Sequence, residues 1–145
     1  MDKVWSTDNP LFCKYIFYSS ILALKMFFMA PMTSFYRRTK LVWINPEDAA
    51  RRNVKIKPND EDVERVRRAH RNDIENIVPF WVLGLLFLQT NPSSLLTLTC
   101  FRLFTLSRIL HSVAYLAQQS FLRGVLFTVG FFINIFMAVY TILFI

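Results

Sequence analysis

The run from Val63 to Phe80 carries residue types and spacings that could do chemistry. It reads VERVRRAHRNDIENIVPF and leads directly into an apolar segment. If the run is one helix, five polar residues lie three, four or seven positions apart and form a stripe, namely Glu64, Arg68, Arg71, Asn72 and Glu75. Arg67 and His70 lie beside this stripe. Charged side chains are costly to expose to lipid, so we expect the stripe to face a neighbouring helix or a wet cavity.

The distribution of charge after this run favours an anionic ligand. No Asp or Glu follows Glu75, yet Arg102, Arg108 and Arg123 do. A pocket between helices with a surplus of guanidinium groups suits a small polyanion held by forked hydrogen bonds, with Asn72 and Glu75 receiving its amine. The alternative is structural pairing of the three arginines with lipid phosphates or with acids elsewhere, which are Asp48, Glu64, Asp73 and Glu75.

Other chemistries have less support. Arg108, His111 and Tyr115 are spaced to share one helix face, but His70 and His111 lie in separate predicted helices with arginines that would repel a cation. We therefore expect no metal site. A Ser-His-Asp triad would need an acid on the helix of His111, which has none. The basic residues do not alternate with aromatic ones on a soluble domain, so we expect no nucleic-acid partner.

Long apolar blocks predict that membrane helices position these residues. The chain has 145 residues, of which 54% are hydrophobic. Four blocks approach the roughly 20 residues that a spanning helix needs, and they predict helices at about 11–36, 62–89, 95–117 and 121–145. The second block reaches this length only if it includes turns of the charged run. We therefore predict an all-α fold, a four-helix transmembrane bundle that forms one domain over residues 1–145.

The predicted loop at about 37–61 sets the orientation in the membrane. Eleven of the 17 Lys and Arg residues lie between Arg37 and Arg71. The positive-inside rule then places this loop in the cytosol and both termini in the lumen. Asn45 and Pro46, followed by two acids, indicate a short surface helix within the loop. No cleavable signal peptide is evident.

Three residues inside the apolar blocks need an explanation. Lys25 lies too deep to flank its helix, so we expect it to reach the membrane interface or a neighbouring helix, with oligomer packing as the alternative. Cys13 and Cys100 are expected to pack as small apolar side chains, without a disulfide.

Several of these segments resemble one known family. The matching residues are Phe35-Tyr36-Arg37, Asn45-Pro46-Glu47-Asp48, the run Val63–Phe80, and Arg108 with His111-Ser112-Val113-Ala114-Tyr115. On these motifs the chain resembles the membrane-associated proteins in eicosanoid and glutathione metabolism (the MAPEG family), and most closely its glutathione transferases. The resemblance covers nearly the whole chain and is weakest in the last helix.

The resemblance implies a homotrimer in the endoplasmic reticulum membrane, with the mitochondrial outer membrane as a second location. Glutathione would bind as co-substrate at three sites between adjacent subunits, near the cytosolic face. A lipophilic electrophile or lipid would enter from the bilayer between the first and the last long helix. The positions that match glutathione-binding residues of the family are Arg37, Arg67, Arg68, His70, Arg71, Asn72, Glu75, His111 and Tyr115. The charge count adds Arg108 to this binding set.

The expected catalytic residues are Arg123, Tyr115 and Asp48. Arg123 matches the family's arginine near the thiol, and Asp48 matches the loop acid associated with it. A free thiol has a pKa of about 8.5, and lowering it by about two units takes roughly 2.7 kcal/mol. A neutral hydroxyl contributes roughly 1 kcal/mol, whereas a guanidinium at about 4 Å contributes up to roughly 4 kcal/mol. The arginine is therefore the stronger candidate, with Tyr115 next.

Two positions depart from the family's patterns. Gly124 stands where the prostaglandin E synthases of the family have a serine proposed to assist the thiol, and Ala49 stands where some transferases have an activating cysteine. We expect conjugation of glutathione to lipophilic electrophiles, with peroxide reduction as a side activity and no activation by thiol modification. One alternative is isomerisation of a prostaglandin endoperoxide, because Arg71 follows His70 as in those synthases. The other is a lipid-binding scaffold without catalysis.

Overall fold

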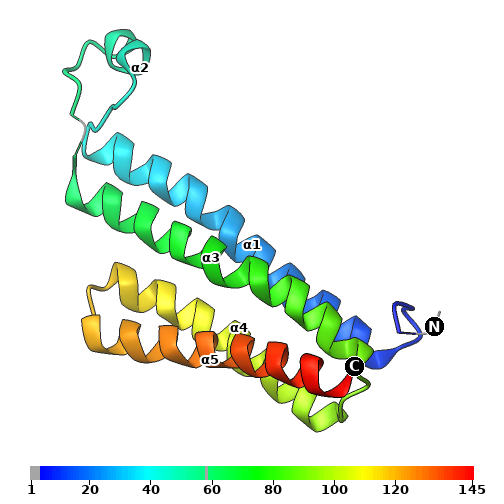
Figure 1. Cartoon of the computed structure of the whole chain (residues 1–145). Coiled ribbons are helices and arrows are strands. Elements are labelled where there is room, and N and C mark those ends of the chain that lie inside the picture. The colour runs from blue at the N-terminus through cyan, green and yellow to red at the C-terminus, as the bar shows by residue number, and fades with distance from the viewer. Residues whose placement is uncertain (1–3, 58) are drawn as a thin grey trace.

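The computed structural model describes residues 4–57 and 59–145. That part of the chain is all-α and contains no strand (Figure 1). The all-α prediction is confirmed, and a short fifth helix joins the four long ones. The helices are α1 (Pro10–Thr39), α2 (Pro46–Arg51), α3 (Glu61–Gln89), α4 (Ser94–Leu116) and α5 (Ser120–Phe144).

Side-chain caps explain where three of the long helices begin. The Asn9 side chain accepts a hydrogen bond from the Leu11 amide at 3.0 Å at the start of α1. Asp60 and Ser93 cap α3 and α4 in the same way. The predicted start of α2 at Asn45 and Pro46 is confirmed, but there the Asn45 amide donates to the Asp48 carboxylate at 3.1 Å instead of capping the backbone.

The helices pack so that α3 and α4 form the centre of the bundle. In Figure 1, α1 and α3 run side by side, and α2 projects beyond the end where they are joined. Helix α3 contacts α1, α4 and α5, and α4 contacts α1 and α5. Within the described ranges α1 and α5 do not touch each other, and α2 touches no other helix. The two helices between which the electrophile is expected to enter are therefore not in contact within the described chain, and this route stays a prediction.

Aromatic side chains fill the interior between α1, α3 and α4. Phe80 and Phe104 stack with ring centroids 4.1 Å apart and planes only 3° from parallel. The Tyr15 hydroxyl donates to the Trp81 carbonyl at 2.7 Å. At Gly84 an added Cβ would lie 2.9 Å from the Tyr15 ring, so a glycine is needed for this approach. In a bilayer such close packing, rather than the exclusion of water, holds helices together.

In the part of the chain that the structure describes, two helices, α1 and α5, are long and apolar enough to cross a membrane. In α3 and α4 polar and charged residues lower the hydropathy, so their crossing stays a prediction. Both nevertheless expose large apolar side chains at helical spacing. These are Ile74, Val78, Val82 and Leu86 on α3, and Leu103, Leu106, Leu110 and Val113 on α4. Such exposed stripes are typical of helices that meet lipid or another subunit.

An ion pair joins α1 to α3 at the α2 end of the bundle, before the predicted spanning part of α3. Lys40 Nζ lies 2.9 Å from Asp62 Oδ2, and Arg65 donates to the same carboxylate at 2.7 Å. These two hydrogen bonds hold the pKa of Asp62 below its usual value, and the bond from Lys40 has the larger effect. The carboxylate in turn raises the pKa of Lys40.

Candidate functional site

A buried polar network joins α1, α3 and α4 around one carboxylate. Arg108 Nη2 donates to Asp73 Oδ1 at 2.7 Å, and neither side chain is exposed at all. Lys25 reaches across from α1 to pair with Asp73 Oδ2. The Ser112 hydroxyl donates to the same oxygen at 3.2 Å. The prediction that Lys25 reaches a neighbouring helix is confirmed, and α3 is that helix.

This network provides the counter-charge of Arg108, one of the three arginines that follow Glu75 in the sequence. An ionised side chain inside a bundle needs a partner, because burial without one is strongly unfavourable. Asp73 supplies that partner to Arg108, so structural pairing applies to Arg108. Two cations then share one carboxylate, which leaves the interior with one excess positive charge.

Arg108 also contacts two residues that the sequence assigned to ligand binding. Its Nη2 donates to Asn72 Oδ1 at 2.8 Å and lies 3.3 Å from His111 Nδ1. Gly130 of α5 packs against this side chain, and a Cβ there would lie 3.4 Å from Arg108 Cδ. The guanidinium is thus a hub inside the bundle. This differs from the expected contact between Arg108 and a ligand.

Arg123 lies over an aromatic ring on the neighbouring helix. Its guanidinium carbon is 4.6 Å from the centroid of the Tyr115 ring, and the Tyr115 ring meets His111 edge-on with centroids 5.6 Å apart. The Arg123 side chain is half-buried and forms no ion pair with a carboxylate of the described chain. Its charge is therefore available to stabilise an anion.

A second cationic surface lies on the first turns of α3. Glu64, Arg67, Arg68 and Arg71 line a shallow pocket of about 150 Å³. Arg67 pairs with Glu64, and Arg68 has no ion-pair partner among the described residues. Three guanidinium groups thus face one carboxylate in this pocket.

The predicted polar stripe divides between two faces of α3. Arg71 and Glu75 lie 4.0 Å apart with side chains 74% and 60% exposed, whereas Asn72 turns inward to Arg108. Asn72 directly follows Arg71, and adjacent residues of a helix point about 100° apart. These two residues therefore cannot lie on the same face of α3. Near the α2 end, Arg37 Nε and His70 Nδ1 are buried without a hydrogen-bond partner in the described chain.

The structure does not join all the predicted site residues. No hydrogen bond or ion pair within the described chain links Arg123 to Arg67, Arg68 or Arg71. Asp48 lies on α2, which contacts no other helix among the described elements. Its carboxylate accepts from Asn45 and does not contact Arg123. One chain therefore presents two separate halves, which we call the α3 arginine surface (Arg67, Arg68, Arg71) and the Arg123–Tyr115 pair.

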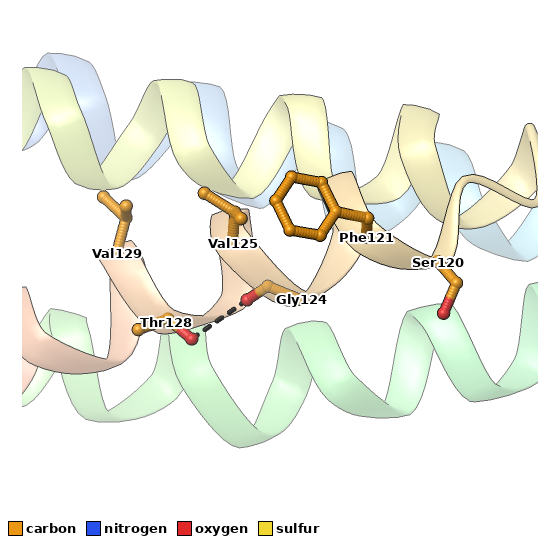
Figure 2. Close-up of a pocket in the computed structure, with 6 residues that line it drawn as sticks. All are labelled: Ser120, Phe121, Gly124, Val125, Thr128 and Val129. Carbon is orange, nitrogen blue, oxygen red and sulfur yellow. Dashed lines mark hydrogen bonds between the residues drawn. The ribbon is translucent and has the colours of Figure 1, made fainter.

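An apolar groove along α5, which Arg123 does not line, was not anticipated from the sequence. Figure 2 shows the six residues that line it along α5, which are Ser120, Phe121, Gly124, Val125, Thr128 and Val129. A Cβ added at Gly124 would have no neighbour within 4 Å, and the Thr128 hydroxyl is satisfied by the Gly124 carbonyl at 3.0 Å. The signal in the sequence is a small or hydroxyl-bearing residue at every fourth position (120, 124 and 128), each followed directly by a phenylalanine or a valine.

The fold and this arrangement define a class of protein. They describe a helical membrane protein with a buried ion-pair network, an open cationic surface, an apolar groove along α5, and an arginine that has no carboxylate partner among the described residues. The chain belongs to the MAPEG family, whose model matches residues 15–143.

Named relatives fall into two groups. The chain is 42% identical to microsomal glutathione S-transferase 1 of Bos taurus over 139 residues, which cover 90% of this chain and 88% of the relative. With the Homo sapiens protein of that name it shares 39% identity over 146 residues, covering 95% and 93%. It is also 40% identical to prostaglandin E synthase of Equus caballus over 105 residues, covering 72% and 69%.

Proposed function

We propose that this protein is a membrane-bound glutathione transferase that conjugates the glutathione thiolate to lipophilic electrophiles. The observations that carry the proposal are the unbalanced cationic surface of α3 and the Arg123 guanidinium, which has no carboxylate partner among the described residues. A separate apolar groove runs along α5. Glutathione is a polyanionic thiol and its second substrate is apolar, so both surfaces have a chemical counterpart. The names of the transferase relatives, which cover most of this chain, agree with this activity.

In this proposal the α3 arginine surface holds the carboxylates of glutathione. Guanidinium groups bind carboxylates through two parallel N–H···O bonds, which fixes the orientation of the ligand. Arg37 and His70 lie near the same end of the bundle and have buried nitrogens free for a further partner. Glu75 is exposed and acts as the acceptor for the ligand's amine.

Arg123 stabilises the thiolate. A depression of the thiol pKa by about two units needs roughly 2.7 kcal/mol, which a guanidinium at about 4 Å can supply at an effective dielectric constant near 20. The proton leaves to solvent, and the thiolate then attacks the electrophile. With an aryl halide, a sulfur–carbon bond forms and the halide departs with the electron pair of the broken bond.

Tyr115 supports Arg123 through its ring. A guanidinium over an aromatic face gains roughly 0.5–2 kcal/mol, enough to hold the charge in one place. The Tyr115 hydroxyl is a further donor to the thiolate. A catalytic role of Asp48 is supported only by the family resemblance, because the helix that carries it contacts no other helix of the described chain.

A complete site needs a second copy of the chain, and we propose a homotrimer. Arg71 and Glu75 are exposed about 15 and 21 Å along α3, at 1.5 Å per residue, a depth at which charges do not face lipid. A neighbouring subunit that covers this face would bring its Arg123–Tyr115 pair to the α3 arginine surface. We place the assembly in the endoplasmic reticulum membrane, with the α2 loop cytosolic and both termini lumenal, and with the mitochondrial outer membrane as a second location.

Turnover of an aryl halide by the purified, detergent-solubilised protein tests the function. We expect glutathione-dependent conjugation, accompanied by an ultraviolet difference signal of bound thiolate before the electrophile is added. Replacing Arg68 and Arg71 by glutamine should raise the KM for glutathione at least tenfold, because two ligand contacts are lost. A protein that shows neither the thiolate signal nor conjugation would overturn the assignment.

Similarity to prostaglandin E synthases supports a second candidate function, the glutathione-dependent isomerisation of an endoperoxide. Gly124 offers no hydroxyl next to Arg123, so such a reaction would depend on the thiolate and Arg123 alone. A direct comparison of kcat/KM for an aryl halide and for a prostaglandin endoperoxide separates the two candidates. We expect the aryl halide to be turned over and the endoperoxide to be isomerised weakly.

A further inference from the structure

We propose that Arg108 is a positioning residue that fixes the direction of Asn72 and His111, so that both present hydrogen-bond donors to the ligand. The side chain is fully buried and cannot itself touch a ligand at the surface of the bundle. Its role in binding is therefore exerted through its neighbours. The functional consequence rests on the proposed binding of glutathione, whereas the geometry can be tested without a ligand.

The orientation of the Asn72 amide follows from the chemistry of arginine. A guanidinium has only donors, so the atom of Asn72 that faces Arg108 Nη2 at 2.8 Å must be the oxygen. The amide nitrogen, Nδ2, then points away. It has no hydrogen-bond partner among the described residues and is not one of their buried unpaired atoms. Asn72 thus offers an N–H group, not a carbonyl, on its open side.

The same reasoning fixes the tautomer of His111. Its Nδ1 lies 3.3 Å from Arg108 Nη2, and a nitrogen that faces a guanidinium donor must carry a lone pair rather than a proton. In a neutral imidazole the proton is then on Nε2. The only hydrogen-bond contact of the His111 ring within the described chain is at Nδ1, and Nε2 is not one of the buried unpaired atoms. His111 therefore also offers an N–H group on the side away from Arg108.

Asp73 holds the guanidinium in the position from which it contacts both residues. Nη2 has two hydrogens and three acceptors, at 2.7 Å in Asp73, 2.8 Å in Asn72 and 3.3 Å in His111. The longest contact shares a hydrogen with a shorter one. Arg108 Nε and Nη1 have no partner in the described chain, so no competing bond turns the group away from this arrangement.

Loss of Arg108 would release both side chains. The Asn72 amide could then rotate and present its oxygen, and the His111 proton could move to Nδ1. Either change replaces a donor by an acceptor, which a carboxylate or thiolate repels. Arg108→Met is a usable variant because Lys25 still neutralises Asp73, so no buried carboxylate is left alone.

A double-mutant cycle on glutathione affinity tests the proposal. The variants are Arg108→Met, Asn72→Ala and the double variant, with thermal unfolding recorded for each. Asn72→Ala should weaken binding about tenfold, the size of one hydrogen bond to a charged group. Arg108→Met should weaken it at least as much, because it also releases His111, and the double variant should be little weaker than Arg108→Met alone. A double variant whose loss equals the product of the two single losses would overturn the proposal. Arg102→Met is the matched control, because this α4 arginine is exposed and, among the described residues, bonds only to the Tyr18 hydroxyl at 3.2 Å.

A spectroscopic measurement separates this inference from the proposed function. The chain has two histidines, so the NMR spectrum of ¹⁵N-labelled histidine contains two sets of ring-nitrogen signals. The set that disappears in the His70→Asn variant belongs to His70, and the other belongs to His111. We expect His111 in the wild type to carry its proton on Nε2 only, and Arg108→Met to give a mixture of tautomers. A wild-type proton on Nδ1 refutes the positioning role even if glutathione binds. Absence of glutathione binding with the expected tautomer refutes the proposed function instead.

Discussion

Asp73 on α3 and Arg108 on α4 form a completely buried ion pair, with 2.7 Å between carboxylate and guanidinium. Lys25 on α1 adds a second cation to the same carboxylate. The three positions are therefore not equivalent. Among the described residues, Asp73 is the only ion-pair partner of both cations. Each cation therefore shares this carboxylate with the other.

Substitutions in this network should reflect that asymmetry. Asp73→Asn leaves two buried cations without a counter-charge, and we expect a loss of about 3–5 kcal/mol in the free energy of unfolding. Lys25→Met keeps the balanced pair of Asp73 and Arg108 and should cost no more than about 1 kcal/mol. Thermal unfolding in one detergent, followed by circular dichroism, measures both. Equal losses would contradict the shared-carboxylate arrangement.

Arg123 should be required for the chemical step rather than for folding. Because it makes no ion pair with a described carboxylate, Arg123→Ala should leave thermal unfolding nearly unchanged. Its kcat with an aryl halide should fall by about two orders of magnitude, as roughly 2.7 kcal/mol of thiolate stabilisation is lost. Arg123→Lys keeps the charge and should retain an intermediate rate. Unchanged turnover of the alanine variant would remove Arg123 from the reaction.

The ring and the hydroxyl of Tyr115 can be separated by two variants. Tyr115→Phe keeps the aromatic face beneath Arg123, 4.6 Å from its guanidinium carbon, and loses the hydroxyl. Tyr115→Leu loses both. If the ring is what holds Arg123, the phenylalanine variant keeps most of kcat and the leucine variant loses about fivefold to thirtyfold, corresponding to roughly 1–2 kcal/mol. Equal losses in both variants would assign the effect to the hydroxyl.

The two glycines of α5 should respond differently to a larger side chain. Gly124→Leu has open space around its Cβ and should fold normally, but it fills the apolar groove. The KM for a bulky electrophile should then rise severalfold while glutathione binding is unchanged. Gly130→Ala is the control, because its Cβ would lie 3.2 Å from Ser107 Oγ, so it should lower the unfolding temperature. A groove variant with unaltered electrophile kinetics would show that the substrate binds elsewhere.

The ion pair of Lys40 with Asp62 should make the α2 end of the bundle sensitive to pH. The pKa of Asp62 is lower in the folded state than in the unfolded state, where it is near 3.8. The stabilisation that this carboxylate gives is therefore complete above the unfolded-state pKa and is lost as the pH falls through the folded-state pKa. The pKa of Lys40 is raised, so its contribution is lost only as the pH rises above about 10.5. Hydrogen exchange in the first turn of α3 should be faster in Asp62→Asn than in the wild type at pH 7, and the two rates should converge as the pH falls through the lowered folded-state pKa of Asp62. A difference that persists after Asp62 is protonated would assign the effect to something other than this carboxylate.

Local features of the sequence were sufficient to predict the helices. The spacing of apolar residues and the capping residues Asp60 and Ser93 act over a few positions, so the helix boundaries follow from residues close in sequence. The charge count also identified Asp73 as one of four possible partners for a late arginine. It could not choose among the four, because the choice depends on how two helices pack.

The sequence by itself determined that this chain is helical, apolar over long blocks and rich in arginine at one end, since each of these properties resides in neighbouring residues. Only the tertiary structure decided that Asn72 faces inward while Arg71 faces outward, and that Arg108 meets an aspartate 35 positions away. It also decided that α1 and α5 stay apart within the described chain. Helix rotation and packing set these relationships, and they depend on the fit of whole helix surfaces rather than on any local pattern.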